Sequence, residues 1–389
     1  MKKLAIISTH PIQYNAPLFR LLALRKNIYV KVFYTWSQLQ HGKKFDPGFG
    51  KTIEWDIPLL DGYEYTFVEN ISAQPGSHHF KGIVNPSLTK EIEEWGANAL
   101  MVYGWNFKSH FKAMRFFKNK MPVLFRGDST LLDETSGLKK IIRRTVLKYI
   151  YSFVDVAFYA GVANKAYFVA HGFNQKQLVF MPHAIDNKRF ANSIENIAAA
   201  KKLRNDLDIP LDATVFLFVG KLENKKQPDF LLASFAALNV THSFLLVIGS
   251  GELEVILKQT YIDYKNIIFL GFQNQLAMPA FYNACNVLIL PSKGPSETWG
   301  LAINEAMAAG KAIIASKACG AVYDLVLPDY NGFIIPTNST VALTNAMLHF
   351  INNATSAELM GANSLSIINQ YTYEADCLAI EATLNSIPA

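Results

Sequence analysis

The chain has 389 residues, of which 50% are hydrophobic and 17% charged, so it can bury more than one core and two domains are expected. No apolar run approaches the roughly 20 residues of a membrane-spanning helix, and no signal-peptide pattern precedes the first apolar segment. Residues 1–190 carry 26 Lys and Arg against 14 Asp and Glu, whereas residues 191–389 carry 11 against 17, which indicates that the first half meets an anionic partner.

The three cysteines, Cys285, Cys319 and Cys377, are widely spaced and lie mostly in apolar contexts. We expect small core residues in a reducing compartment rather than disulfides or a zinc site. This cysteine usage and the missing signal pattern favour a cytoplasmic protein.

In the first half, short apolar strands alternate with amphipathic segments, which predicts a parallel sheet covered by helices on both faces. The predicted strands are residues 4–8, 30–34, 99–102, 123–125, 156–159 and 178–180. Residues 36–86 form a long aromatic-rich segment with turn sequences such as Phe45–Gly50, and we expect it to carry binding function. The first domain is predicted to span residues 1–190.

The second domain, predicted over residues 191–372, opens with a polar helix over 191–208 and then alternates strands with helices. The predicted strands are residues 214–219, 244–248, 267–270, 287–290 and 312–315, and the helices are 228–239, 252–260, 276–284 and 300–309. This order predicts a second parallel α/β domain.

Two carboxylates lie eight positions apart, Glu297 in a loop after an apolar strand and Glu305 inside the next helix. At ~1.5 Å per residue, eight positions span roughly 12 Å, about the reach from a pyrophosphate-linked sugar to the nucleoside ribose. Between them, Gly300 lets the backbone approach a ligand at a helix start, where N–H groups and the dipole favour an anion. The pattern favours a nucleotide-sugar site, and a helix with one solvated and one N-terminal glutamate is the plain alternative.

Residues 290–310, LPSKGPSETWGLAINEAMAAG, resemble the donor-site signature of the retaining glycosyltransferases of family 4, which have the GT-B fold. Further matches follow the family's order over roughly residues 178–340: Val219–Lys226, Leu246–Leu253, Ile268–Phe272 with Asn283–Ser292, and Asn331–Pro336. The resemblance implies an α/β protein with two Rossmann-like β/α/β domains that face each other across a cleft. It also implies that a C-terminal helix, residues 373–389, packs back on the first domain.

The resemblance implies a donor site in the second domain. Lys221 and Lys226 would hold the donor pyrophosphate, Glu297 would orient the sugar hydroxyls, and Glu305 would accept from the ribose. Lys221 stands where the family more often has arginine, so the charge is kept but the bidentate fork is lost. The remaining residues expected around the donor are Gly220, Gly249, Gly251, Phe272, Leu276, Thr298, Trp299, Gly300 and Leu301.

The sequence contains no Asp-x-Asp motif after an apolar strand and no cluster with metal-ligand spacing. We therefore expect catalysis without a metal, and no cofactor beyond a nucleotide diphosphate sugar of UDP or GDP type. Cations preorganised at the leaving diphosphate would take the role of the metal. The resemblance also implies retention by front-face attack, in which the leaving phosphate helps to deprotonate the acceptor.

The acceptor side is predicted in the first domain. His10 follows the first strand as a candidate contact to acceptor or phosphate, with a satisfied structural histidine as the alternative. Trp105 and Asn106 are expected to line the acceptor cleft, and Arg126 is a further candidate. Asp128 is predicted to contact the donor sugar, or else to cap a helix N-terminus.

A basic amphipathic helix is predicted over residues 138–150. Cations at positions 139, 140, 143, 144 and 148 share one face, and Leu138, Ile141, Ile142, Val146, Tyr149 and Ile150 lie on the other. Such a helix either packs its apolar side on the core or lies on an anionic membrane surface. The second interpretation fits a lipid-linked acceptor and a peripheral position on the inner face of the cytoplasmic membrane.

Together these features predict a retaining glycosyltransferase that moves a sugar from a nucleotide sugar to a saccharide or lipid-linked saccharide acceptor. Bacterial surface-polysaccharide synthesis is the expected setting by family association. A nucleotide-sugar epimerase of the same fold and a non-catalytic nucleotide- or glycan-binding protein are the alternatives. Nucleic-acid binding is not expected, because the basic half contains no recognised module.

Overall fold

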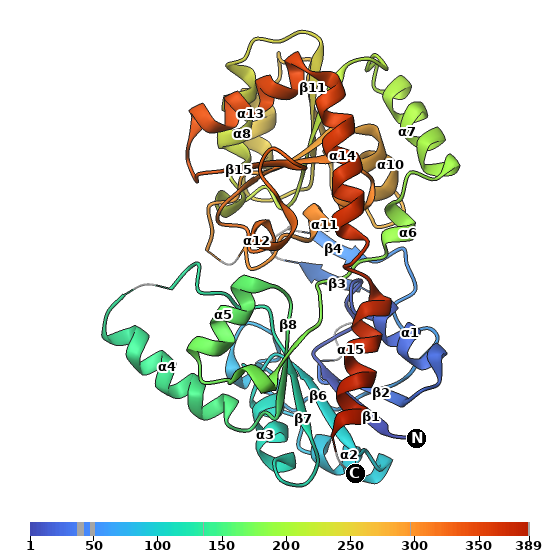
Figure 1. Cartoon of the computed structure of the whole chain (residues 1–389), viewed down its shortest axis with the longest axis vertical. Helices are drawn as coiled ribbons and strands as arrows, with labels where there is room; N and C mark the ends of the chain where they lie inside the picture. The colour runs from blue at the N-terminus through green and yellow to red at the C-terminus, as the bar shows by residue number, and fades with distance from the viewer. Residues whose placement is uncertain (37–42, 47–50, 135, 296, 388–389) are drawn as a thin grey trace. The chain divides into compact units, whose positions relative to one another are not determined.

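The computed structural model describes residues 1–36, 43–46, 51–134, 136–295 and 297–387. The chain folds into two compact units, and each unit consists of a sheet with helices layered on it (Figure 1). The N-terminal unit comprises Met1–Lys44, Ile57–His183 and Tyr373–Ala389, and the C-terminal unit comprises Phe45–Asp56 and Ala184–Thr372. This division differs from the predicted one because residues 45–56 and 184–190 belong to the C-terminal unit.

The N-terminal unit is built on a seven-stranded parallel sheet in the order β5-β2-β1-β6-β7-β8-β9. Its strands are β1 (Lys3–Ser8), β2 (Tyr29–Tyr34), β5 (Glu64–Phe67), β6 (Ala99–Tyr103), β7 (Val123–Arg126), β8 (Val156–Tyr159) and β9 (Leu178–Phe180). Six of these were predicted from apolar runs, whereas β5 was not.

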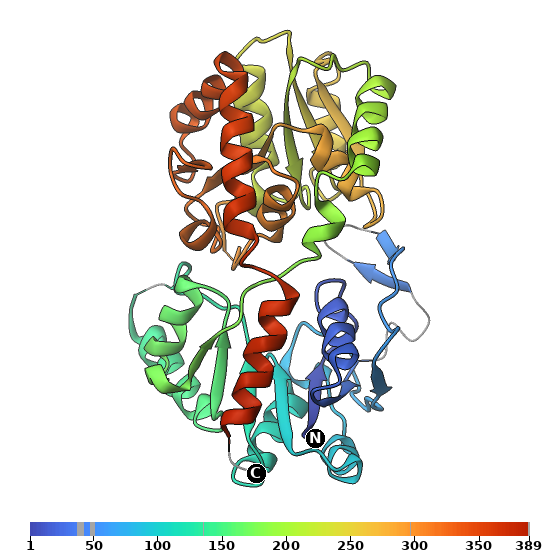
Figure 2. The same cartoon turned by 45° about the vertical axis from the view of Figure 1, so that its right-hand side comes forward.

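Helices cover the sheet of the N-terminal unit. They are α1 (Ala16–Arg25), α2 (Leu88–Trp95), α3 (Lys108–Phe117), α4 (Leu138–Tyr151), α5 (Val162–Ala170) and α15 (Tyr373–Ser386), with short 3-10 turns η2 (Phe80–Gly82) and η3 (Gln175–Gln177). Residues of α2 to α5 pack with strand residues such as Ile7 and Phe125 in one core cluster. The C-terminal helix α15 packs alongside α1 (Figure 2).

The C-terminal unit has a six-stranded parallel sheet in the order β12-β11-β10-β13-β14-β15. Its strands are β10 (Thr214–Val219), β11 (Ser243–Ile248), β12 (Ile267–Gly271), β13 (Val287–Leu290), β14 (Ala312–Ser316) and β15 (Gly332–Ile335). The first five agree with the predicted strands to within one residue at each end. Neighbouring residues of β10, such as Phe216 and Leu217, are both fully buried, because helices cover both faces of a parallel sheet.

The helices of the C-terminal unit lie on both sides of its sheet, with α8 and α13 on one side and α7 and α10 on the other (Figure 1). Their bounds are α6 (Asn187–Phe190), α7 (Ile194–Asp206), α8 (Pro228–Ala236), α9 (Glu254–Thr260), α10 (Met278–Ala284), α11 (Leu301–Ala308), α12 (Val322–Leu325), α13 (Thr340–Asn352) and α14 (Ala354–Ile368), with the 3-10 turn η4 (Asn224–Lys226).

The aromatic-rich segment of residues 36–86 is more ordered than predicted. It contains β5 and a separate two-stranded sheet of β3 (Lys43–Asp46) and β4 (Lys51–Glu54). Residues 37–42 and 47–50 of this segment, and with them most of the Phe45–Gly50 turn sequence, lie outside the described residues.

Candidate functional site

The loops that follow β10, β11, β12 and β13 carry most of the residues predicted to bind the donor. Because these strands are parallel and adjacent, their carboxyl ends meet at one edge of the sheet, where ligands of open α/β sheets bind. Gly220 and Lys221 directly follow β10, and Glu297 lies beyond β13. The fold of the C-terminal unit thus brings together residues that are up to 77 positions apart in the sequence, Gly220 and Glu297.

Lys226 and Glu297 contact each other directly as an ion pair. Glu297 is 7% exposed, and its carboxylate also accepts a hydrogen bond of 3.0 Å from Ser292 Oγ. The turn η4, which carries Lys226, is attached to the neighbouring loop because Lys293 N donates to Lys225 O at 2.9 Å. The predicted phosphate-binding cation and the predicted sugar-orienting carboxylate therefore lie at one point of the unit.

Gly249 and Gly251 have positive φ angles of 136° and 159°. A Cβ on Gly249 would lie 1.8 Å from the carbonyl oxygen of Gly220, and one on Gly251 would lie 2.6 Å from that of Leu222. The same loops are joined by a 3.0 Å hydrogen bond from Leu222 N to Ser250 O. Glycine is thus required here by close contact between two loops, a reason that the sequence did not reveal.

The amino end of α11 carries the next four predicted residues. Gly300 caps the helix with a φ of 102°, and Thr298, Gly300 and Leu301 are all partly exposed. The preceding loop is held because Gly320 N donates to Glu297 O at 3.1 Å. Trp299 differs from its neighbours, since it is 5% exposed and donates to Asn304 Oδ1 at 2.8 Å. Its side chain packs inward, so only its main chain can face a ligand.

Glu305 lies within α11 and is 3% exposed. One of its carboxylate oxygens accepts a 2.6 Å hydrogen bond from the hydroxyl of Tyr282, which is itself fully buried on α10. The carboxylate is therefore fixed in direction by a neighbour that the sequence did not indicate. Its predicted contact with a ribose stays a prediction.

The loop of Phe272 and Leu276, predicted to bound the nucleobase, is contacted by a segment from far earlier in the chain, although Leu276 itself is 65% exposed. The rings of Trp55 and Phe272 lie 6.5 Å apart, and Asn274 Nδ2 donates to Glu54 O at 2.6 Å. The carboxylate of Asp56 accepts from Leu276 N at 3.1 Å. Sequence analysis assigned residues 54–56 to the first domain and missed this contact.

In the N-terminal unit, the predicted acceptor residues gather at the carboxyl ends of the adjacent strands β1, β6 and β7. The ring of His10 meets the ring of Trp36 edge-on at 5.5 Å, and its Nδ1 lies 2.9 Å from Thr9 Oγ1. Trp105 is half-buried and packs on the core, whereas Asn106 is exposed.

Arg126 and Asp128 occupy different environments. Arg126 is 5% exposed, and its guanidinium donates to the main-chain oxygens of Met181 and Pro182, which occupies two of its five N–H groups. Asp128 is exposed. Its alternative role as a helix N-cap is wrong, because the next helix, α4, begins ten residues later with Gly137 as its cap.

Two buried histidines near these strand ends are held neutral. Burial lowers the pKa of His110 to about 4, while its ring nitrogens lie 2.8 Å from Gly104 O and 2.8 Å from Thr35 Oγ1. Burial, together with the charge on Arg126, lowers the pKa of His183 to about 3. Both are therefore neutral at pH 7, and His110 connects the loops that carry Gly104 and Thr35.

Other features of the described residues bear on the predicted chemistry. No group of three or more His, Cys, Asp or Glu side chains among them is placed to hold a metal ion. In the same part of the chain, no helix is long and apolar enough to cross a membrane. The three cysteines are free and buried, in agreement with the prediction of small core residues.

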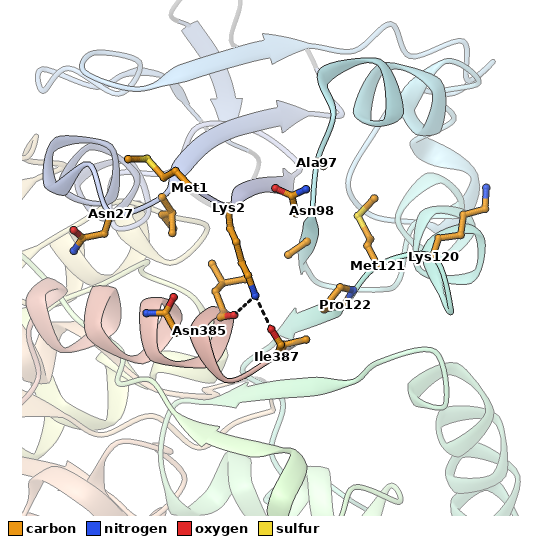
Figure 3. Close-up of a pocket in the computed structure, with 13 residues that line it drawn as sticks. Met1, Lys2, Asn27, Ala97, Asn98, Lys120, Met121, Pro122, Asn385 and Ile387 are labelled. Atoms are coloured by element: carbon orange, nitrogen blue, oxygen red, sulfur yellow. Dashed lines mark hydrogen bonds between the residues drawn. The ribbon is translucent and has the colours of Figure 1, made fainter. Parts of the chain in front are cut away.

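A pocket of about 520 Å³ lies in the N-terminal unit, but at the amino ends of its strands (Figure 3). Its lining includes Lys2, whose Nζ donates to Leu384 O at 2.5 Å and to Ile387 O at 2.6 Å. These bonds cap the carboxyl end of α15. None of the residues predicted for function lines this pocket.

Comparison with known proteins identifies the family. The family "Glycosyl transferases group 1" matches residues 170–366, about half of the chain. The chain belongs to this family. This glycosyltransferase is 25% identical over 284 residues to an uncharacterized glycosyltransferase of Methanocaldococcus jannaschii, over 64% of this chain and 78% of the relative.

A second relative is the lipopolysaccharide 1,2-N-acetylglucosaminetransferase of Salmonella typhimurium, which is 31% identical over 143 residues. That match spans 34% of this chain and 37% of the relative. Among solved structures, HepE of Anabaena in complex with UDP aligns over 100% of both chains with a TM-score of 0.73 and 19% identity. Similarity at this level establishes the fold, and it confirms the predicted GT-B fold.

Proposed function

We propose that this glycosyltransferase moves a sugar from a nucleoside diphosphate sugar to a saccharide or lipid-linked saccharide hydroxyl, with retention and without a metal ion. The observation that carries the proposal is the contact of Lys226 with Glu297 at the carboxyl edge of the C-terminal sheet. A cation and a carboxylate at this edge match the two ends of a sugar diphosphate, a charged diphosphate and a hydroxyl-rich ring.

In the proposed reaction, the bond from the sugar anomeric carbon to the diphosphate oxygen breaks, and a bond to the acceptor oxygen forms on the same face. The acceptor proton passes to the departing diphosphate. Lys221 and Lys226 stabilise the charge that develops on that leaving group, together with the N–H groups at the start of α11. Glu297 orients the sugar hydroxyls, which contributes by positioning rather than by covalent attack.

A donor of UDP or GDP type is proposed. HepE of Anabaena, which shares the fold, is described in complex with UDP, which supports a uridine donor. Glu305 would accept a hydrogen bond from the ribose while Tyr282 keeps the carboxylate oriented. The loop of Phe272 and Leu276 would lie against the base.

The proposed setting is surface-polysaccharide synthesis in the cytoplasm or at the inner face of the cytoplasmic membrane. The similarity to a lipopolysaccharide sugar transferase supports it. The two alternatives can be told apart by product analysis. An epimerase would release altered sugar or nucleotide with no acceptor present, and a binding protein would release no product.

The test compares Lys226→Ala and Glu305→Ala with wild type, measuring transfer and nucleoside diphosphate release from a panel of UDP- and GDP-sugars in the presence of EDTA. We expect Lys226→Ala to lower kcat by about 10²–10³-fold, as for other removed charge-stabilising donors. Lys225→Ala is the matched control, because the Lys225 side chain pairs with Glu223 at 3.3 Å instead of Glu297. Transfer that is unaffected in both Lys226→Ala and Glu305→Ala would refute the assigned donor site.

A further inference from the structure

The helix α4 presents an apolar stripe to solvent. Large apolar side chains recur at helical spacing along it, and about half or more of the surface of each is exposed: Leu138 71%, Ile141 63%, Ile142 56%, Val146 48% and Tyr149 54%. Of the apolar side expected from the sequence, only Ile150 is buried. The interpretation of α4 as a helix that packs this side on the core is therefore wrong.

A different face attaches α4 to the N-terminal unit. Leu147, Ile150 and Tyr151 are each at most 5% exposed and pack into the core cluster of that unit. At about 100° per residue, these positions lie opposite the exposed stripe. Since the helix is anchored by its other face, packing within the unit does not explain the stripe, and Figure 1 shows α4 on the outside of the unit.

Cations flank the stripe and fall into two groups. Lys140 and Arg144 both pair with Glu134 at 2.8 Å, which fixes the helix to the preceding loop. Lys139, Arg143 and Lys148 are exposed, and none of them forms an ion pair with a carboxylate in the described part of the chain. Lys139 and Lys148 thus flank the apolar stripe on its two sides, and Arg143 lies further round the helix; none of the three has a protein counter-charge among the described residues.

An aromatic row continues the stripe onto the neighbouring elements. The ring of Tyr149 lies 6.5 Å from that of Phe111 on α3, and Phe111 lies 6.4 Å from Phe80, which is 42% exposed. The guanidinium of Arg115 lies 5.7 Å from the Phe111 ring. The outer surface of α4 and this aromatic row therefore form one continuous surface of apolar and aromatic side chains with cations at its borders.

We propose that this surface, the stripe of α4 with Tyr149, Phe111 and Phe80, docks on a membrane whose headgroups are anionic. Helices with an apolar face and flanking Lys and Arg lie in the plane of the bilayer interface, with the apolar side chains below the headgroups. Each Lys or Arg near an anionic surface adds to the attraction. A second copy of the chain is a poorer occupant, because pairing two such surfaces would bring like charges together.

The test measures co-flotation of the full chain with vesicles of phosphatidylcholine alone and of phosphatidylcholine mixed with phosphatidylglycerol. We expect binding to the anionic vesicles that weakens with salt, and Ile141→Ser/Ile142→Ser to lower the partition coefficient by about tenfold or more. The matched control is Val255→Ser/Ile256→Ser on α9, another adjacent pair, 71% and 59% exposed, which should bind like wild type. The variant Lys139→Gln/Arg143→Gln tests the electrostatic contribution, and it should reduce binding to the anionic vesicles mainly at low salt.

Equal binding of Ile141→Ser/Ile142→Ser and wild type to anionic vesicles would overturn the proposal, as would no binding by wild type. Concentration-dependent self-association that is lost in the same variant, without vesicle binding, would overturn it in favour of a dimer surface. Nucleoside diphosphate binding should be unchanged in Ile141→Ser/Ile142→Ser, because α4 lies in the N-terminal unit. Failure of the membrane proposal is therefore distinguishable from failure of the proposed transfer reaction.

Discussion

Gly249 shows how a residue near a binding loop can be fixed by the protein's own backbone. Its φ is positive, and a Cβ at this position would lie 1.8 Å from the Gly220 oxygen, which leaves no room for a side chain. Gly271, at the end of the adjacent strand β12, has a positive φ of 66° but open space around it. A side chain at Gly271 would therefore meet only the strain of a positive φ, whereas one at Gly249 would also overlap with the backbone of Gly220.

We expect Gly249→Ala to lower the free energy of unfolding by about 3 kcal/mol or more, because either the carbonyl or the strand must move. Gly271→Ala should cost only about 1–2 kcal/mol, the penalty of a left-handed conformation for alanine. Urea denaturation of both variants measures the difference. Equal losses would show that the loops can separate at little cost, contrary to the contact described.

At this scale the sequence predicts which residues meet but not how they are oriented. Lys226 and Glu297 could be placed together because they follow β10 and β13, which are adjacent parallel strands. The hydrogen bond from Tyr282 to Glu305 could not be predicted, since it depends on how the helices α10 and α11 face each other. The burial of Arg126 was missed for a similar reason, because its partners are main-chain oxygens that no motif marks.

The C-terminal helix α15 is tied to α1 by a bidentate ion pair. Arg25 Nε and Nη2 lie 2.7 and 2.9 Å from the two carboxylate oxygens of Glu381, which is 7% exposed. The hydrogen bond and charge of Arg25 lower the pKa of Glu381 below its ordinary value. Because the folded pKa is depressed, the stabilisation is present at neutral pH and is lost as the pH falls through the folded pKa.

We expect Glu381→Gln to lower the free energy of unfolding by about 1–2 kcal/mol at pH 7, the range for one partner lost from a charge-assisted pair. The difference from wild type should shrink below about pH 4, the ordinary range of a glutamate. Thermal unfolding at both pH values measures this. A gap that stays constant with pH would contradict the assigned ion pair.

The segment of residues 54–56 makes a second contact between elements that are distant in the sequence, with the loop of residues 272–276. Trp55 and Asp56 contact the loop that is proposed to bind the base, through a ring contact with Phe272 and a hydrogen bond from Leu276 N. We expect Trp55→Ala to weaken nucleoside diphosphate binding by about two- to tenfold, since an aromatic contact contributes about 0.5–1.5 kcal/mol. Titration calorimetry measures the change.

Thr52→Ala is the control for that experiment, because Thr52 is exposed on β4, the strand that directly precedes Trp55. It should bind nucleotide like wild type. Unchanged binding by Trp55→Ala would show that the segment covers the loop without supporting the base site.

Strands with strong apolar runs were predictable, including the edge strands β9 and β12, whereas two other edge strands were missed. The strands β5 and β15 lie at the edges of their sheets, and β5 has no fully buried side chain. A short, half-exposed edge strand leaves little apolar signal in the sequence. The surroundings of α4 were left open between core and membrane for a different reason, because periodicity identifies an apolar face but not what that face contacts.

At the scale of the whole molecule, the chain joins its two units in more places than the sequence indicates. It passes between them after Lys44, Asp56, His183 and Thr372. The return of the last helix was expected from the family resemblance, whereas the short excursion of residues 45–56 was not. Such an excursion is decided by tertiary contacts and leaves no composition shift to detect.

The structure also suggests a reason for the uneven distribution of charge along the chain. The basic excess lies within residues 1–190, and part of it surrounds the exposed stripe of α4. The proposed donor site lies in the other unit, and residues 191–389 carry only 11 Lys and Arg, among them Lys221 and Lys226. The two proposed anionic partners, a lipid surface and a diphosphate, would therefore bind different units.

The most direct test of the donor site is thermal unfolding of wild type and Lys226→Ala with UDP, GDP, ADP, TDP or CDP in the presence of EDTA. A ligand that binds only the folded state stabilises it by roughly 2.7 kcal/mol at 100 times its dissociation constant. We predict that one nucleotide, of uridine or guanosine type, raises the wild-type midpoint selectively and that Lys226→Ala loses most of this shift. No shift of the wild type with any nucleotide would contradict the donor site.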